Sequence, residues 1–200
     1  ILIVGIGDLR KNTVNDIKDN LRRAGGQVAA VAKNSSVYEV ILVLPDYLKS
    51  LPGSGAEQIV EGVLLGDYRF DKYKKEKDDE NIYSGIKTIT LYTKKDSSGV
   101  RKIVKRACGV CESANIAKDM ANEPGNHWVP ESFAEFARKL ARKSSLKCVV
   151  LGKEQIKKEG MGGILAVNQG SAVPPRLVIL EHLPPKYSKS IVLVGTGVTF

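Results

Sequence analysis

Short apolar runs alternate with segments of helical periodicity along the first half of the chain. The runs at residues 1–7 (ILIVGIG), 38–44 (YEVILVL) and 86–93 (IKTITLYT) predict three strands. Between them, apolar side chains recur every three or four positions in residues 13–33 and 54–64. Both segments open on Thr or Ser with an acid three positions later, the pattern of a helix capping box. Strands that alternate with helices predict an α/β fold.

A long helix is predicted from Val100 to about Ala121, because apolar residues recur there at spacings of three and four. Many of them are small, so a neighbouring element could pack closely against this helix. The NEPGN segment ends it, since Pro124 and Gly125 cannot continue a helix. The charged stretch 71–84 and the segment 94–99 (KKDSSG) are expected to be an exposed loop and a turn.

The last third of the chain starts again with a helix, which Pro130 opens at a favourable position. Three further strands are expected at residues 147–151, 176–183 and 190–194. We therefore expect residues 1–99 to be part of an N-terminal α/β domain and residues 100–122 to be a connecting helix. Residues 123–200 would begin a second α/β domain.

Composition narrows the class of protein. The 200 residues contain no apolar run of about 18 residues, which predicts that no helix spans a membrane. No signal peptide is visible, and the absence of an initiator Met suggests that residues precede Ile1. Three cysteines are too few for a disulfide scaffold and fit a reducing compartment, so we expect a cytoplasmic protein.

The formal net charge of +9 fits a solvated basic surface or an anionic partner such as nucleic acid. Two basic clusters stand out: Arg101, Lys102, Lys105 and Arg106, and then Arg138, Lys139, Arg142, Lys143 and Lys147. Few aromatic residues accompany either cluster, so the sequence does not indicate a platform on which bases would stack.

Several short motifs are compatible with a site, but each has a simpler structural interpretation. Gly5 and Gly7 begin a dinucleotide-binding pattern, but Arg10 replaces its third glycine, which favours a plain turn. Cys108 and Cys111 have the spacing of a redox or metal pair. They fall inside a helix with no second ligand pair at zinc-site spacing, which favours small core residues.

Two histidines and one glycine-rich segment complete the candidates. His127 and His182 are isolated in the sequence, and a structural role is favoured for the loop residue His127. The segment 161–171 (MGGILAVNQGS) is expected to be a loop whose backbone could approach a ligand or another chain.

Longer stretches carry a resemblance. DMANEPGNHWVPESFAEFARKLA, GMGGILAVNQGSAVPPRLVILEH and IVLVGTGVTF resemble the leucine (cytosol) aminopeptidase family, in the order in which that family has them. EGVLLGDYRFDKYK, residues 61–74, is similar to a segment at the end of the family's N-terminal domain. The resemblance covers almost the whole chain.

The resemblance implies a macro-domain-like N-terminal α/β domain, a connecting helix, a catalytic domain and a homohexamer. It also implies removal of leucine-like N-terminal residues from peptides by two divalent ions, zinc, manganese or magnesium, that activate a water. In the family, a metal-binding lysine stands where this chain has Thr196, and a metal-binding aspartate follows Phe200. The resemblance therefore implies no intact catalytic or metal site within these residues.

Two functions remain open at this point. One is a metallo-aminopeptidase, of which this chain is an internal fragment without activity of its own. The other is a non-catalytic family member that forms oligomers or binds DNA, as some bacterial members do. Thr196 fits a diverged paralogue, a sequence-level change in a normal enzyme or a degraded gene.

Overall fold

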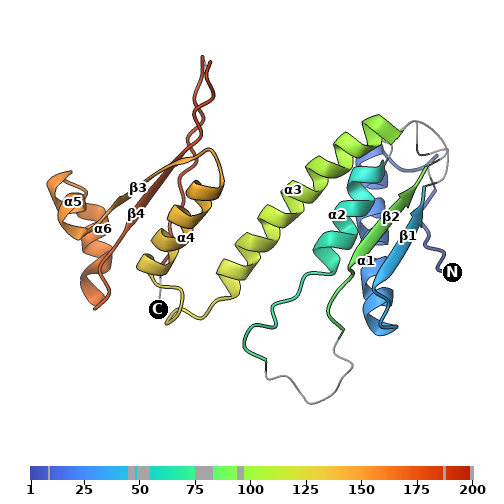
Figure 1. Ribbon diagram of the computed structural model, residues 1–200, viewed down its shortest axis with the longest axis horizontal. Helices are drawn as coiled ribbons and strands as arrows, with labels where there is room; N and C mark the ends of the chain where they lie inside the picture. The colour runs from blue at the N-terminus through green and yellow to red at the C-terminus, as the bar shows by residue number, and fades with distance from the viewer. Residues whose placement is uncertain are drawn as a thin grey trace. The chain divides into compact units, whose positions relative to one another are not determined.

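The computed structural model describes residues 1–8, 10–44, 48, 55–74, 83–93, 97–186 and 188–198. The chain divides into two compact units, residues 1–122 and 123–200 (Figure 1). Both units combine helices with a pair of strands, which confirms the predicted α/β class. No helix in the described part of the chain is long and apolar enough to cross a membrane.

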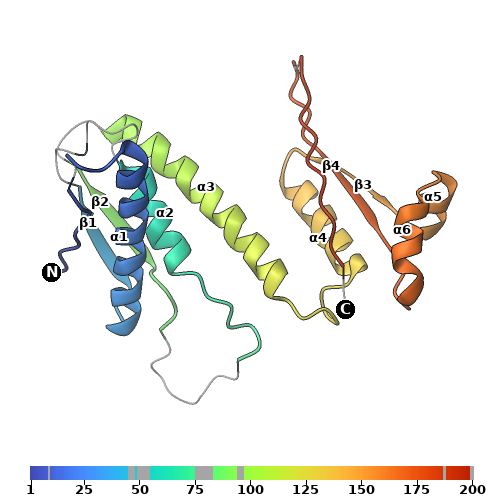
Figure 2. The ribbon, with the colours of Figure 1, turned by 180° about the vertical axis from the view of Figure 1, so that it is seen from behind.

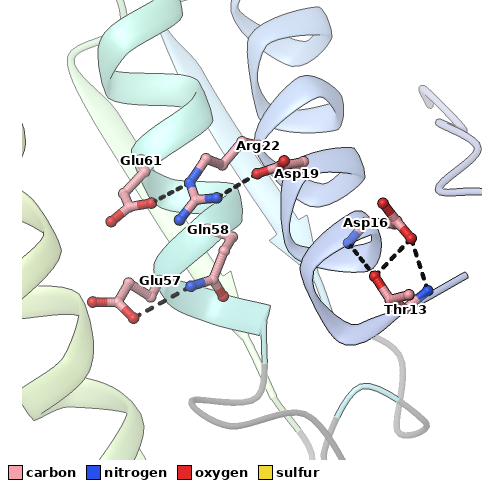
Figure 3. Close-up of polar contacts among 7 residues, drawn as sticks. All are labelled: Thr13, Asp16, Asp19, Arg22, Glu57, Gln58 and Glu61. Atoms are coloured by element: carbon pink, nitrogen blue, oxygen red, sulfur yellow. Dashed lines mark hydrogen bonds and ion pairs between the residues drawn. The ribbon is translucent and has the colours of Figure 1, made fainter.

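Helix α1 (Val14–Asn34) opens the first unit, and its beginning is fixed by the predicted capping box (Figure 3). The Asp16 N–H donates to Thr13 Oγ1 at 3.2 Å, and the Thr13 N–H donates to Asp16 Oδ2 at 2.9 Å. The Thr13 hydroxyl and backbone lower the pKa of Asp16 because their hydrogen bonds favour the charged carboxylate. Two N–H groups that the helix leaves free are thereby satisfied.

Helix α2 (Ala56–Gly66) begins differently from α1. Gly55 precedes it with a φ of +67°, a backbone conformation that favours glycine. As a glycine it has no side chain that could cap the helix. Ser54, the cap expected from the sequence, lies outside the described residues. Strand β1 (Glu39–Val43) precedes α2 in the chain and strand β2 (Thr88–Tyr92) follows it. The two strands pair in parallel, with Ile41 opposite Thr90.

The core of the first unit lies between the strand pair and its helices. Ile17, Leu21, Leu44, Leu48 and Ala56 form its buried centre, and Leu91 of β2 packs against them. Figures 1 and 2 show α1 on one side of the two strands. On the opposite side of the strands, Ile41, Val43 and Tyr92 are exposed.

Helix α3 (Ser97–Asn122) ends the first unit. It starts earlier than its apolar pattern predicts, so residues 97–99 of the expected turn are helical, while residues 94–96 lie outside the described part. Of the expected loop 71–84, the described residues 71–74, 83 and 84 belong to no helix or strand.

The second unit begins with α4 (Pro130–Lys143), which has Pro130 in its first turn as predicted. Strands β3 (Lys147–Leu151) and β4 (Leu177–Glu181) pair antiparallel, with Lys147 opposite Glu181. Between them lie α5 (Lys153–Lys158), α6 (Gly162–Val167) and the short 3-10 helix η3 (Asn168–Gly170). Ala134 and Ala137 of α4 and Ile156 of α5 are buried.

Three expectations from the sequence are wrong. Residues 1–7 and 190–194 form no strand, because within the described residues no neighbouring strand pairs with their backbone. Ile1 and Ile3 are exposed, and so is every residue from Ile191 to Val194. The segment 161–171 is not one loop, because α6 and η3 occupy most of it: a run of apolar residues after two glycines completes one helical turn and more.

Candidate functional site

The turn that carries the family resemblance is exposed. Thr196 lies between Gly195 and Gly197, and residues 188–198 form neither helix nor strand. A β-carbon added at either glycine would meet no atom within 4 Å. Within the described ranges, no three His, Cys, Asp or Glu side chains come together in a way that could hold a metal ion. Among the residues that the structure describes, no set of metal ligands surrounds Thr196.

The glycines near the N-terminus form a turn. Gly7 has a φ of +84°, and a β-carbon there would lie 2.8 Å from the Asn12 side-chain nitrogen. The Asn20 side-chain amide donates to the Ile6 carbonyl oxygen at 3.1 Å. Helix α1 starts only at Val14. This geometry matches the turn favoured by the sequence, since a dinucleotide site needs the helix to begin directly after the glycines.

The two cysteines of the CxxC pair lie in the middle of α3, away from a helix N-terminus. Cys111 is buried and Cys108 is half-buried, and neither is in a disulfide. Burial raises the pKa of the Cys111 thiol, and the nearby Glu61 carboxylate adds to the shift. A raised pKa leaves little thiolate, which is the form that reacts or binds a metal. Cys111 thus has the character of a core residue.

A cluster of three charged residues joins α4 to the residue just before β4 in the second unit. Glu131 accepts from Arg138 Nη1 at 3.0 Å and from Arg176 Nε at 2.5 Å. The guanidiniums of Arg138 and Arg176 lower the pKa of Glu131. Arg176 also donates to the Pro175 carbonyl oxygen, so its guanidinium is fixed in place. Arg138 belongs to the second basic cluster of the sequence, and here it shares the single Glu131 carboxylate with Arg176.

A polar depression of about 500 Å³ lies where α2 ends, beside the start of β2. Its wall includes Asp67, which accepts from the Ile86 N–H at 2.7 Å and from the Tyr83 hydroxyl at 3.1 Å. Burial of Tyr83, with the charge of Asp67, raises the pKa of that hydroxyl to about 12. The depression also contains Tyr68 and Asp119, which are hydrogen-bonded to each other.

Sequence reasoning did not single out these residues as a group. The quoted segment 61–74 contains Asp67 and Tyr68, but its partners lie 19 and 51 positions away along the chain. No spacing rule connects residues so far apart. The charged, aromatic character of GDYRFDKYK was the only signal available.

The other single candidates remain apart. His127 follows α3, where its N–H donates to the Pro124 carbonyl oxygen at 2.8 Å, and His182 comes directly after β4. The ring of Trp128, next to His127, meets Phe133 and Phe136 edge-on, with centroids 6.3 and 5.9 Å away. This aromatic cluster packs the start of α4 and contains no group that could act as a base or a metal ligand.

Comparison with known protein families decides the relationship. Residues 1–77 match the N-terminal domain of the cytosol aminopeptidase family, and residues 115–200 match the catalytic domain of the same family. The chain belongs to the cytosol aminopeptidase family. The catalytic-domain match of this family begins inside α3, so that helix contributes to it as well as to the first unit.

Relatives of the family resemble the whole chain. It is 43% identical over 201 residues to a probable cytosol aminopeptidase of Desulforapulum autotrophicum, with 100% of this chain and 39% of the relative aligned. It is 37% identical to the probable cytosol aminopeptidase of Aquifex aeolicus, of which it covers 38%. The chain thus spans about two fifths of the length of these relatives.

Solved structures show the same fold. The bottromycin maturation enzyme BotP in complex with Mn has a TM-score of 0.75 and 28% identity, over 91% of this chain and 36% of that one. A mutant of tomato leucine aminopeptidase has a TM-score of 0.73 and 24% identity, over 84% of this chain and 34% of that one.

Proposed function

We propose that this chain is part of a metal-dependent aminopeptidase that releases leucine-like residues from the N-termini of peptides. The observation that carries the proposal is the 43% identity to a probable cytosol aminopeptidase over the whole chain. The manganese in the BotP complex supports a divalent ion, zinc or manganese, as the cofactor. When bound, such ions would supply an activated water and stabilise negative charge on the substrate.

The described residues do not fit two such ions by themselves. Thr196 offers one hydroxyl, which is a weaker ligand than a lysine amine, and no second metal-binding side chain is described beside it. We therefore propose that these 200 residues provide the scaffold leading to the centre and have no peptidase activity alone. A homohexamer and a cytoplasmic location follow from the family resemblance and belong to the same proposal.

The test compares this chain with a polypeptide extended to the length of its relatives. Both are assayed for hydrolysis of leucyl-amide with added zinc or manganese. We expect metal-dependent turnover by the extended form and none by the 200 residues above a control without protein. An extended form without metal-dependent turnover would contradict the enzyme proposal, and turnover by the 200 residues would contradict their inactivity.

A second candidate function, binding to DNA, is favoured by one surface. Arg101, Lys102, Lys105 and Arg106 are exposed on α3, and none has an acidic partner among the described residues. The helix contains no acid from Ser97 to Cys111. Binding through these cations would weaken steeply with salt, because each phosphate contact releases counterions. Fluorescence anisotropy with duplex DNA at two salt concentrations tests this, and Lys102→Glu together with Lys105→Glu should abolish the binding.

A further inference from the structure

The last turn of α3 is bridged by a tyrosine that follows α2. The Tyr68 hydroxyl donates to Asp119 Oδ1 at 2.9 Å and accepts from Asn122 Nδ2 at 3.0 Å. Asp119 and Asn122 are three positions apart, so both lie on one face of the helix. The Tyr68 hydroxyl oxygen therefore links the two ends of this turn through a chain of two hydrogen bonds, from the Asn122 amide to the hydroxyl and from the hydroxyl to the Asp119 carboxylate.

Two further contacts continue along the same face of α3. Lys118 Nζ lies 4.7 Å from the centroid of the Tyr68 ring, within the range of a cation–π contact. The Asn115 side-chain amide donates to the Leu64 carbonyl oxygen, near the end of α2, at 3.4 Å. Asn115, Lys118, Asp119 and Asn122 have the spacing i, i+3, i+4 and i+7 of one helical stripe.

The sequence of the last turn of α3 does not itself favour a stable helix end. This turn contains no basic residue, although a positive charge there would favour the helix dipole. Asp119 places a negative charge at this end, which the dipole disfavours. The last four carbonyl groups of any helix also lack partners within it. Such an end would fray unless contacts from outside the helix kept it ordered.

We propose that Tyr68 is a latch that keeps the last turn of α3 helical and so fixes the point at which the chain leaves the first unit. Asn122 is the last residue of that unit. With the latch closed, the helix continues to this boundary. When the two hydrogen bonds of Tyr68 are broken, residues 119–122 leave the helix and lengthen the segment that follows it, which becomes less ordered.

Hydrogen exchange of the full chain tests the latch. Tyr68→Phe keeps the ring and its contact with Lys118 but removes both hydrogen bonds. We expect the amides of residues 119–123 to exchange about tenfold faster in this variant, as loss of the hydrogen bonds predicts. Exchange in the middle of α3 should stay unchanged. Asn122→Ala, which removes one of the two bonds, should give a smaller increase in the same amides.

Tyr92→Phe is the matched control, since Tyr92 of β2 is exposed and no contact of its hydroxyl is described. It should leave exchange at residues 119–123 as in the parent. Unchanged exchange in Tyr68→Phe would overturn the proposal. An equal increase throughout the first unit would also overturn it, because that result would show a general loss of stability rather than a local latch.

Discussion

Gly25 of α1 and Gly62 of α2 meet backbone to backbone where the two helices cross: a β-carbon built on Gly25 would lie 2.9 Å from the Gly62 Cα. One on Gly62 would lie 2.0 Å from the Arg22 carbonyl oxygen. Arg22 and Glu61, paired at 2.7 Å, join the helices beside this crossing (Figure 3). The crossing depends on the absence of side chains at these two positions.

Gly62→Ala should therefore destabilise the first unit, although alanine is the better helix former. Overpacking a close contact costs about 1–3 kcal/mol or more. Urea unfolding of the parent and the variant measures the difference. Gly26→Ala is the matched control, because its β-carbon would lie 3.9 Å from the nearest atom, an ordinary contact. Stability should stay the same or rise there by up to about 1 kcal/mol, and equal losses in both variants would contradict this account.

Stability in alkali should depend on Tyr83. Its pKa is raised from 10.0 to about 12, so the folded state holds the proton more tightly than the unfolded state. The stabilisation of the folded state by the protonated Tyr83 is fully present below pH 10 and is lost as the pH rises toward about 12. Urea unfolding across this window should show a decline that Tyr83→Phe makes shallower. The exposed Tyr92 provides a control, since its replacement by Phe should leave the decline in place.

The two thiols of α3 should differ in reactivity. Cys111 is 1% exposed and has a raised pKa, whereas Cys108 is half-buried. Iodoacetamide should modify Cys108 well before Cys111 in the folded chain, as peptide mapping by mass spectrometry would show.

Cys111→Ala should lower the free energy of unfolding by about 1 kcal/mol, through loss of a buried group. Loss of bound metal in a Cys108→Ala, Cys111→Ala variant would instead indicate a ligand pair.

Thr196→Lys tests whether position 196 is a metal-ligand position in this protein, as the resemblance to the family implies. In a polypeptide of the relatives' length, the lysine amine would restore a nitrogen ligand at a turn kept open by Gly195 and Gly197. Changes outside the direct ligand shell alone shift metal affinity by roughly 10–100-fold, so we expect at least that gain, together with faster leucyl-amide hydrolysis. Metal titration of the Thr and Lys forms checks it. Equal affinities and equal rates would show that position 196 is not a ligand.

The sequence predicted best what depends on neighbouring residues. Periodicity and start signals placed both ends of α1, the beginning of α4 and the whole of β3 within about one residue, because such signals act over a few positions. The apolar runs at 1–7 and 190–194 wrongly predicted strands, since strand formation also needs a partner strand. The Tyr68–Asp119 bond joins residues 51 positions apart, and only the folded chain brings them together.

The order of strands and helices also has a kinetic consequence. Strands β1 and β2 are direct neighbours, yet α2 and the segment that follows it lie between them in the chain. Bringing such distant segments together restricts the chain before any ladder bond forms, which makes parallel pairing slow. The α1–α2 crossing requires closure of a shorter loop and should form first. Newly synthesised chains would thus expose both strand edges for a time, and chaperones that recognise extended apolar segments would meet them in that interval.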